Sequence, residues 1–127
     1  MSAPAPLSAE LRADLGDFRL EVELSLPGEG ISCLFGRSGA GKTTTLRCLA
    51  GLSPARGRIE VAGVPWQDDE RGLNLAVPER RVGYVFQGAA LFPHLDVAGN
   101  LDFALSRVPT AERSLTRAEA VEWLGLA

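Results

Sequence analysis

The sequence predicts an α/β fold, and three observations support this fold class. Residues 18–26 alternate between apolar and polar side chains, which is typical of a strand with one face in solvent. Residues 31–35 are uncharged and mostly apolar, as in a central strand that is buried on both faces. A glycine-rich loop follows this stretch directly, and residues 42–50 then form a predicted helix. The sequence therefore predicts a strand, a loop and a helix in immediate succession.

Further segments complete the prediction for the first half of the chain. Residues 1–11 are rich in alanine, proline and serine, and we expect a flexible tail there. The predicted helix ends at Gly51, because glycine favours the position that follows a helix. Residues 58–62 form another candidate strand. Residues 65–79 are mostly polar and are predicted to form a long surface loop.

The second half is predicted to hold one strand and two helices. Residues 81–86 are an apolar strand candidate. Asp96 is a candidate N-cap for a helix with apolar side chains along one side, and Pro109 is expected to end that helix. Thr116 and Glu119 have the spacing of a capping box, which predicts the start of a last helix.

Composition narrows the classes of function. A chain of 127 residues is long enough for one domain with a core. The net charge of −3 disfavours a broad surface for nucleic acid, so no nucleic-acid partner is expected. The longest uncharged stretch, residues 82–95, is too short and too interrupted to span a bilayer. Cys33 and Cys48 lack metal-binding spacing and are interpreted as small buried side chains in a reducing cytosol.

The glycine-rich loop carries the strongest chemical signal. Residues 36–43 match G-x-x-x-x-G-K-[ST], the P-loop pattern, in which backbone N–H groups and a helix N-terminus surround phosphate. Lys42 is the only lysine of the chain, and its compact ammonium fits between phosphate oxygens better than a planar guanidinium. Chance alone would give this pattern in about one chain in a hundred. The expected nucleotide-binding residues are Gly36, Arg37, Ser38, Gly39, Ala40, Gly41, Lys42, Thr43 and Thr44.

Chemistry assigns a role to three of these side chains. The ammonium of Lys42 is expected to reach the β- and γ-phosphates of a nucleoside triphosphate. The hydroxyl of Thr43 is expected to bind Mg²⁺, and Thr44 is expected to donate to the α-phosphate. ATP and Mg²⁺ are therefore the expected ligands.

Two segments together resemble one family. GRSGAGKTTT at residues 36–45 resembles the P-loop of ABC transporter ATPases. RRVGYVFQ at residues 80–87, followed by LFPHL, is similar to the Q-loop of that family. The resemblance implies that Gln87 helps Thr43 to hold Mg²⁺ and positions the attacking water, as a catalytic residue. It also implies a P-loop NTPase (RecA-like) core with an antiparallel β subdomain.

The resemblance also divides the chain and suggests a substrate. Residues 12–127 are similar to the N-terminal part of the ATPase domain, with the Q-loop and the start of the helical subdomain from about residue 88. The ATPase subunits of molybdate importers are the most similar to two segments, PERRVGYVFQ and the later LFPHLDVAGNLDFAL. ATPases of sulfate, iron or polyamine importers remain alternatives. The implied partners are transmembrane permease subunits, a second ATPase subunit in a homodimer and, indirectly, a periplasmic or extracellular binding protein. The implied location is peripheral, on the cytoplasmic face of the inner membrane.

Several positions depart from the family pattern. Gly88 follows Gln87 where many members have an acidic residue. The aromatic residue that stacks on adenine in many members is not found near Leu15. Phe18 is either its replacement or a core residue. His94 belongs to the Q-loop segment and is not the catalytic switch histidine.

Other expected features are missing from the sequence. There is no LSGGQ-type signature, no apolar run ending in Asp-Glu that would supply the general base, and no later switch histidine. We therefore expect an incomplete ATPase domain, a fragment of a translocase that binds nucleotide weakly and has negligible turnover alone. The alternative is a non-catalytic nucleotide-binding half-domain. A P-loop kinase of small molecules is disfavoured by the Q-loop segment.

Overall fold

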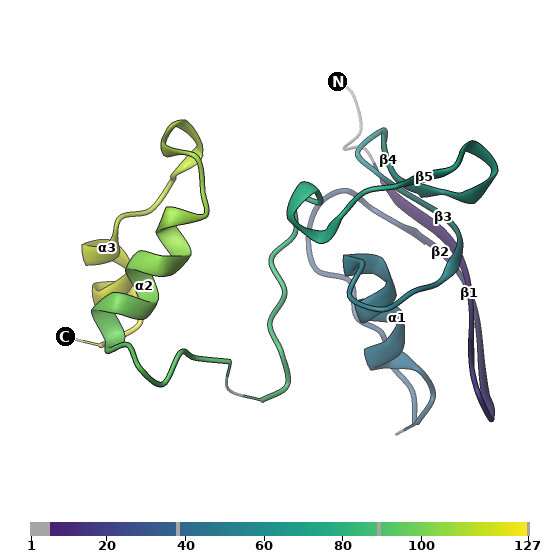
Figure 1. Cartoon of the computed structure of the whole chain (residues 1–127), viewed down its shortest axis with the longest axis horizontal. Helices are drawn as coiled ribbons and strands as arrows, with labels where there is room; N and C mark the ends of the chain where they lie inside the picture. Colours follow the sequence, from purple (N-terminus) through teal and green to yellow (C-terminus); the bar gives the residue numbers. More distant parts are fainter. Residues whose placement is uncertain (1–5, 38, 89, 127) are drawn as a thin grey trace. The chain divides into compact units, whose positions relative to one another are not determined.

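The computed structural model describes residues 6–37, 39–88 and 90–126, and the chain divides into two compact units between Tyr84 and Val85 (Figure 1). The first unit is a sheet with one α-helix against it, and the second contains two short α-helices. No helix in the described ranges is long and apolar enough to cross a bilayer.

The sheet of the first unit has five strands, and every pair of neighbours is antiparallel. Along the sheet the order is β2-β1-β3-β4-β5. The chain between β4 and β5, and the chain after β5, each contain one turn of 3₁₀ helix, at Asp69–Arg71 and Val77–Glu79. The strands are β1 Leu7–Leu15, β2 Phe18–Leu26, β3 Arg56–Val61, β4 Val64–Asp68 and β5 Leu73–Asn74.

One face of this sheet buries the core under helix α1, Lys42–Ala50. Because strand side chains alternate between faces, Leu11 of β1 and Leu20 of β2 point into the same layer, where Cys48 of α1 meets them. The helix and its end at Gly51 are confirmed as predicted, and Gly51 adopts the left-handed conformation with φ of 83°. The buried core consists of Ala9, Leu11, Ala13, Leu20, Cys48, Ile59 and Trp66.

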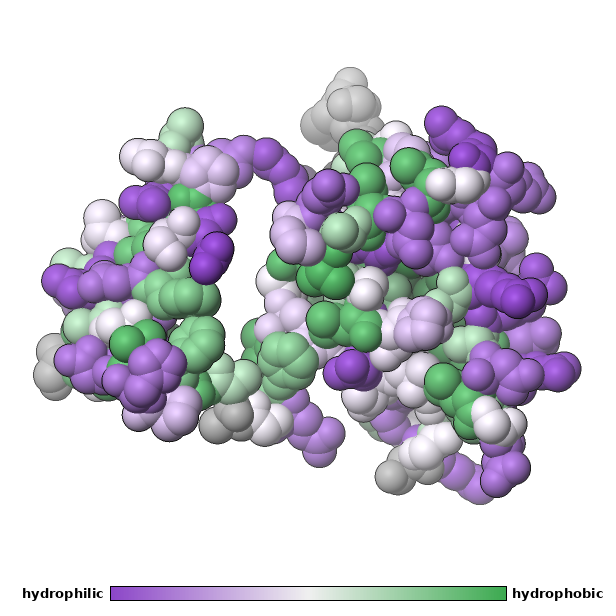
Figure 2. Space-filling view, in the orientation of Figure 1, coloured by the Kyte–Doolittle hydropathy of each residue, from purple (hydrophilic) through white to green (hydrophobic). Residues whose placement is uncertain are grey.

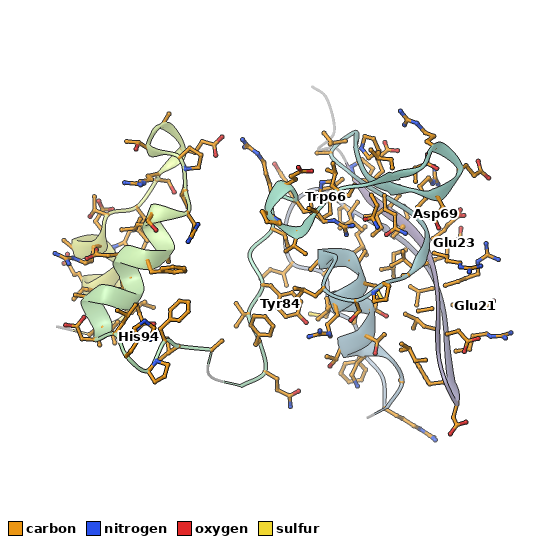
Figure 3. The ribbon with its side chains drawn as sticks, in the orientation of Figure 1. Glu21, Glu23, Trp66, Asp69, Tyr84 and His94 are labelled. Carbon is orange, nitrogen blue, oxygen red and sulfur yellow. The ribbon has the colours of Figure 1, made fainter. Side chains whose placement is uncertain are left out.

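The opposite face of the sheet is charged. Glu21 and Glu23 of β2 point away from α1 (Figure 3), and hydrophilic residues gather over this part of the unit in Figure 2. Glu10 lies opposite Glu23 across the β1–β2 pair and opposite Arg58 across the β1–β3 pair. The contact of 3.8 Å between Arg58 Nη2 and Glu10 Oε1 offsets the repulsion between the two glutamates.

Two expectations about strands are corrected by the sheet. The flexible tail predicted for residues 1–11 is wrong from Leu7 onward, because β1 begins there and pairs with both β2 and β3; residues 1–5 lie outside the described ranges. The loop predicted for residues 65–79 is wrong for its first part, since β4 buries Trp66 and Gln67. The strand predicted over residues 18–26 is confirmed as β2.

The two strands predicted at residues 31–35 and 81–86 are absent. Both segments run without regular secondary structure, and Ile31, Phe35 and Val85 are 95%, 101% and 95% exposed. Cys33 is exposed too, against expectation. A strand needs a neighbouring strand to complete its ladder. Among residues 6–37, 39–88 and 90–126, no strand pairs with either segment.

The second unit confirms both predicted helix caps. Helix α2, Val97–Ser106, begins after Asp96, whose Oδ1 accepts a hydrogen bond of 2.7 Å from the Gly99 N–H. Helix α3, Arg117–Trp123, begins after Thr116, whose Oγ1 accepts from the Glu119 N–H at 3.2 Å. Helix α2 ends before Pro109, and one 3₁₀ turn, Thr110–Glu112, separates the two helices.

An ion pair and an asparagine organise this unit further. Arg117 of α3 donates to Asp102 of α2 over 2.9 Å. Asn100 holds the segment before α2, because its Oδ1 accepts from the Phe92 N–H at 2.9 Å. Phe92 lies edge-on to Phe103, with 4.6 Å between ring centroids, and His94 lies edge-on to Phe92 at 5.8 Å.

Candidate nucleotide-binding site

The loop before α1 turns sharply because two of its glycines take up left-handed backbone angles. Gly39 has φ of 82°, and Gly41, the N-cap residue of α1, has φ of 95°. The Ala40 N–H donates to the Arg37 carbonyl over 3.1 Å, which closes the turn. Side chains other than glycine rarely adopt such angles, so the glycines allow the chain to enter the helix at once.

Aromatic and aliphatic side chains lie directly behind the loop. A Cβ atom on Gly41 would lie 2.9 Å from Phe18 Cζ and 3.0 Å from Leu20 Cδ1. Phe18 is partly buried and packs against the core cluster, which favours the core interpretation of this residue over adenine stacking. The loop is therefore supported from the sheet side by β2.

Lys42 lies back over the loop that precedes it. Its ammonium donates to the carbonyl oxygens of Gly36 and Arg37, the latter at 3.0 Å. The backbone N–H groups in the first turn of a helix have no partner within the helix, and they carry the positive end of the helix dipole. Thr43 and Thr44 lie in this first turn. The positive ammonium and the free helix end suit a phosphate group.

Thr45 secures the start of the helix without facing the loop. It is buried, and its Oγ1 donates to the Gly41 carbonyl over 2.8 Å. The backbone N–H of Thr45 donates to the same oxygen, also over 2.8 Å. Gly41 is thus fixed by two hydrogen bonds from one residue, which holds the first turn in place beneath the loop.

The structure brings the predicted site residues together with two exceptions, Ser38 of the P-loop and Gln87 of the Q-loop segment. Gly36, Arg37 and residues 39–44 form one turn and the start of α1. Ser38 lies outside the described residues. Gln87 is exposed and belongs to the second unit, so its expected approach to Mg²⁺ together with Thr43 stays a prediction. Within the described ranges, no cluster of three His, Cys, Asp or Glu side chains could hold a metal ion.

A cavity elsewhere in the first unit does not include this loop. It has a volume of about 660 Å³ and is open to solvent, with arginines and carboxylates side by side around it. Three arginines, Arg12, Arg19 and Arg56, line it together with Asp14 and Glu21. The two carboxylates reduce the positive potential of the arginines, which makes the cavity less suited to phosphate.

Sequence reasoning missed Arg80. It is buried, with 3% of its surface exposed, and it contacts the C-terminal end of α1, the end opposite the loop. Burial lowers the pKa of this guanidinium. An arginine in a polar stretch gives no signal of burial, because most arginines lie at the surface. Only the partners supplied by the fold reveal it.

Comparison with known proteins connects this geometry to a family. A family model described as "ABC transporter" matches residues 20–127. The "Molybdenum import ATP-binding protein ModC" of Pseudomonas savastanoi pv. phaseolicola is 48% identical over 123 residues, which are 96% of this chain and 34% of that protein. "Molybdenum import ATP-binding protein ModC 1" of Azotobacter vinelandii is 47% identical over 121 residues, 94% of this chain and 34% of the relative.

A relative from Aromatoleum aromaticum shows higher identity over a shorter stretch. Its "Molybdenum import ATP-binding protein ModC" is 52% identical over 110 residues, which are 86% of this chain and 29% of that protein. This chain therefore spans about a third of the length of these relatives.

Proposed function

Because this chain belongs to the ABC transporter family, we propose that it supplies the ATP-binding P-loop of an importer ATPase. The observation that carries the proposal is the ammonium of Lys42, held over the loop at the N-terminus of α1. The γ-phosphate of ATP would replace the two carbonyls as partner of the ammonium. The backbone N–H groups from Gly36 to Thr44 would bind the remaining phosphate oxygens.

Mg²⁺ would screen the phosphate charges of the bound nucleotide. We propose that Thr43 Oγ1 and Gln87 Oε1 are its ligands and that Gln87 also positions the attacking water. Both groups are neutral oxygens, a donor type that Mg²⁺ accepts beside phosphate and water. When bound, Mg²⁺ would neutralise charge that develops on the phosphates during hydrolysis.

The exposed apolar segments support a larger core. We propose that residues 31–35 and 81–86 join a parallel sheet of the P-loop NTPase (RecA-like) type, with strands other than β1–β5. Ile31, Phe35 and Val85 are almost fully exposed, and apolar side chains at such exposure favour burial against further structure. In this arrangement the P-loop would directly follow one strand and Gln87 would directly follow another.

Molybdate is the proposed substrate of the complete importer. The support is the printed function of the relatives, which are molybdenum import proteins, and sulfate, iron and polyamine importers are the alternatives. The proposed partners are transmembrane permease subunits, an identical ATPase subunit and, through the permease, an extracytoplasmic binding protein. The proposed location is the cytoplasmic face of the inner membrane, as a peripheral subunit.

A second function is favoured by one property of the sequence. It contains no signature motif, no Asp-Glu after an apolar run and no switch histidine. A chain acting without these groups would bind nucleotide but could not activate water or stabilise the transition state. The alternative function is therefore a non-catalytic nucleotide-binding module.

Lys42→Ala tests the proposed function. We expect this change to weaken binding of a fluorescent ATP analogue in the presence of Mg²⁺ by at least about tenfold, because a charge-assisted contact to phosphate is lost. Lys42→Arg should bind almost as weakly, since its guanidinium is too wide for the loop. Fluorescence titration of purified chains measures both affinities, and Arg71→Ala, at an exposed arginine, is the control.

The same variant distinguishes the alternatives in cells. The test uses a strain from which the native gene has been deleted. The native gene should restore molybdate uptake, and the same gene carrying Lys42→Ala should not. Restored uptake of sulfate, iron or a polyamine would instead assign one of those importers. Equal nucleotide affinity of Lys42→Ala and the unchanged chain would rule out the P-loop proposal altogether.

A further inference from the structure

Arg80 connects the end of the P-loop helix to the edge of the sheet. Its Nη1 donates to the carbonyl oxygens of Leu49 and Cys48 at 3.0 and 3.4 Å. On its other side, Nη2 donates to Asn74 Oδ1 at 2.7 Å, and Nε donates to the Leu75 carbonyl at 3.0 Å. One planar group therefore joins the last turn of α1 to strand β5 and the residue after it.

The hydrogen bonds from Arg80 stabilise the C-terminal end of α1 electrostatically. The last carbonyls of a helix lack partners within it and carry the negative end of the dipole, which favours a cation there. The guanidinium lies directly against Gly51, the residue that ends α1. A Cβ atom on Gly51 would lie only 2.9 Å from Arg80 Cζ and would displace the guanidinium. The absence of a side chain at Gly51 thus lets the guanidinium approach the helix end closely.

Arg80 is also the start of the segment that leads to Gln87. Its own backbone carbonyl accepts a hydrogen bond of 2.8 Å from the Val82 N–H, and its N–H donates to the Val77 carbonyl over 3.1 Å. Both its side chain and its backbone are therefore held in the first unit. Residues 81–84, the last of the first unit, therefore begin at the same residue that holds α1.

A buried arginine with satisfied hydrogen bonds could simply stabilise the fold. Its location argues for more than that. The helix it holds is a single nine-residue element whose other end forms the loop with Lys42, and a helix of this length moves as one rigid body. A shift or tilt at Leu49 would therefore displace the loop N–H groups, and phosphate contacts depend strongly on such placement.

We propose that Arg80 is a positioning residue for the phosphate site, acting through α1 and through the start of the Gln87 segment. The proposal rests on the proposed function of the P-loop. The guanidinium fixes the C-terminal end of α1, so that the glycine loop and Lys42 have one orientation before nucleotide arrives. It does not contact the nucleotide itself.

Affinity and stability are measured separately to test this role. The test uses the whole chain with Mg²⁺ and a fluorescent ATP analogue, at a temperature where circular dichroism shows each variant to be folded. Arg80→Gln is expected to weaken nucleotide affinity by about tenfold while the number of binding sites per folded chain stays the same. Arg71→Gln, an exposed arginine of the same unit, should leave the affinity unchanged.

A double-mutant cycle tests whether Arg80 acts through the loop. If it does, Arg80→Gln combined with Lys42→Ala should lose less affinity than the product of the two separate losses. Should Arg80→Gln fail to fold, Asn74→Ala removes one acceptor of the guanidinium at an exposed residue and is expected to give a smaller loss of the same kind. Arg80→Lys should not restore full affinity, because one ammonium cannot serve both elements.

The outcomes separate this proposal from the function of the P-loop. Loss of affinity in Lys42→Ala without loss in a folded Arg80→Gln or Asn74→Ala would overturn the positioning role and leave ATP binding in place. A lowered midpoint of thermal unfolding with unchanged affinity would assign Arg80 to stability alone. Unchanged affinity in Lys42→Ala would overturn the proposed function first.

Discussion

Gly57→Ala is expected to disrupt the sheet, with a loss of about 4 kcal/mol or more in the free energy of unfolding. Gly57 lies in β3 opposite Leu11 of β1, with φ of 128°. A Cβ atom there would lie 1.8 Å from the carbonyl oxygen of Glu10. The obstacle is backbone in the strand beside it, so no side-chain rotation can relieve the overlap.

The consequence would extend beyond β3. Strand β1 pairs with β2 on one side and β3 on the other, so separating β1 from β3 would divide the core beneath α1. The Gly57 N–H also donates to Asp69 Oδ2 over 2.8 Å, and this contact would be strained by the same shift. A loss of this size approaches the whole stability of a small domain.

Urea unfolding followed by circular dichroism measures this effect, with Gly63→Ala as the matched control. Gly63 also has a positive φ, 78°, but nothing lies within 4 Å of a Cβ atom there. The control should lose only about 1 kcal/mol, the cost of placing alanine in a left-handed conformation. Equal losses in the two variants would show that β1 and β3 separate easily, against the pairing described above.

Gly41→Ala is expected to damage the loop and the core behind it together, with a loss of about 3 kcal/mol in stability. The backbone at this residue has φ of 95°, and the new methyl group would press on Phe18 and Leu20. Either the two side chains move or the N-terminus of α1 shifts. A shift of the helix would also remove the proposed phosphate site, so nucleotide affinity should fall below detection.

Gly30→Ala is the control for the conformational part of this effect. Gly30 has φ of 82°, and no atom lies within 4 Å of a Cβ there. Thermal unfolding and titration with a fluorescent ATP analogue should show a small loss of stability and unchanged affinity in the control. Full affinity in Gly41→Ala would mean that the loop tolerates a side chain at its last residue, and the geometric argument would then be wrong.

The sequence predicted correctly those helices whose ends have a capping residue. Asp96 and Thr116 cap their helices as predicted, and Gly51 ends α1. Strand β2 follows from strict alternation of apolar and polar residues. In each case the interactions that define the element are close in sequence, so the residue types alone carry the information.

The features that could not be predicted depend on interactions between residues far apart in the sequence. Two of the three buried positions of strand β1 are small alanines, Ala9 and Ala13, so the strand lacks the β-branched pattern by which strands are predicted. Arg80 acquires its role only when β5 and α1 come together. At residues 31–35 the sequence predicted a strand that does not form. The apolar run is typical of a strand, but no strand among the described residues pairs with it.

Cys33 is exposed and Cys48 is buried, so the alkylation rates of the two thiols can be used to follow unfolding of the first unit. Cys48 is 1% exposed; burial raises the pKa of its thiol, and the nearby charge of Arg47 opposes this only in part. Cys33 is exposed. We expect iodoacetamide at mildly alkaline pH to alkylate Cys33 promptly and Cys48 only as fast as α1 separates from the sheet, because the thiolate is the reactive form.

Peptide mass spectrometry over a time course measures the two rates. Prompt alkylation of both thiols would show that α1 does not protect Cys48. With Gly57→Ala the two rates should converge, since the core around Cys48 opens. Because the folded state raises the pKa of Cys48, stability should also decline as the pH rises above the pKa of the unfolded thiol. One reagent would thus follow the opening of the helix that carries the phosphate loop, without any added label.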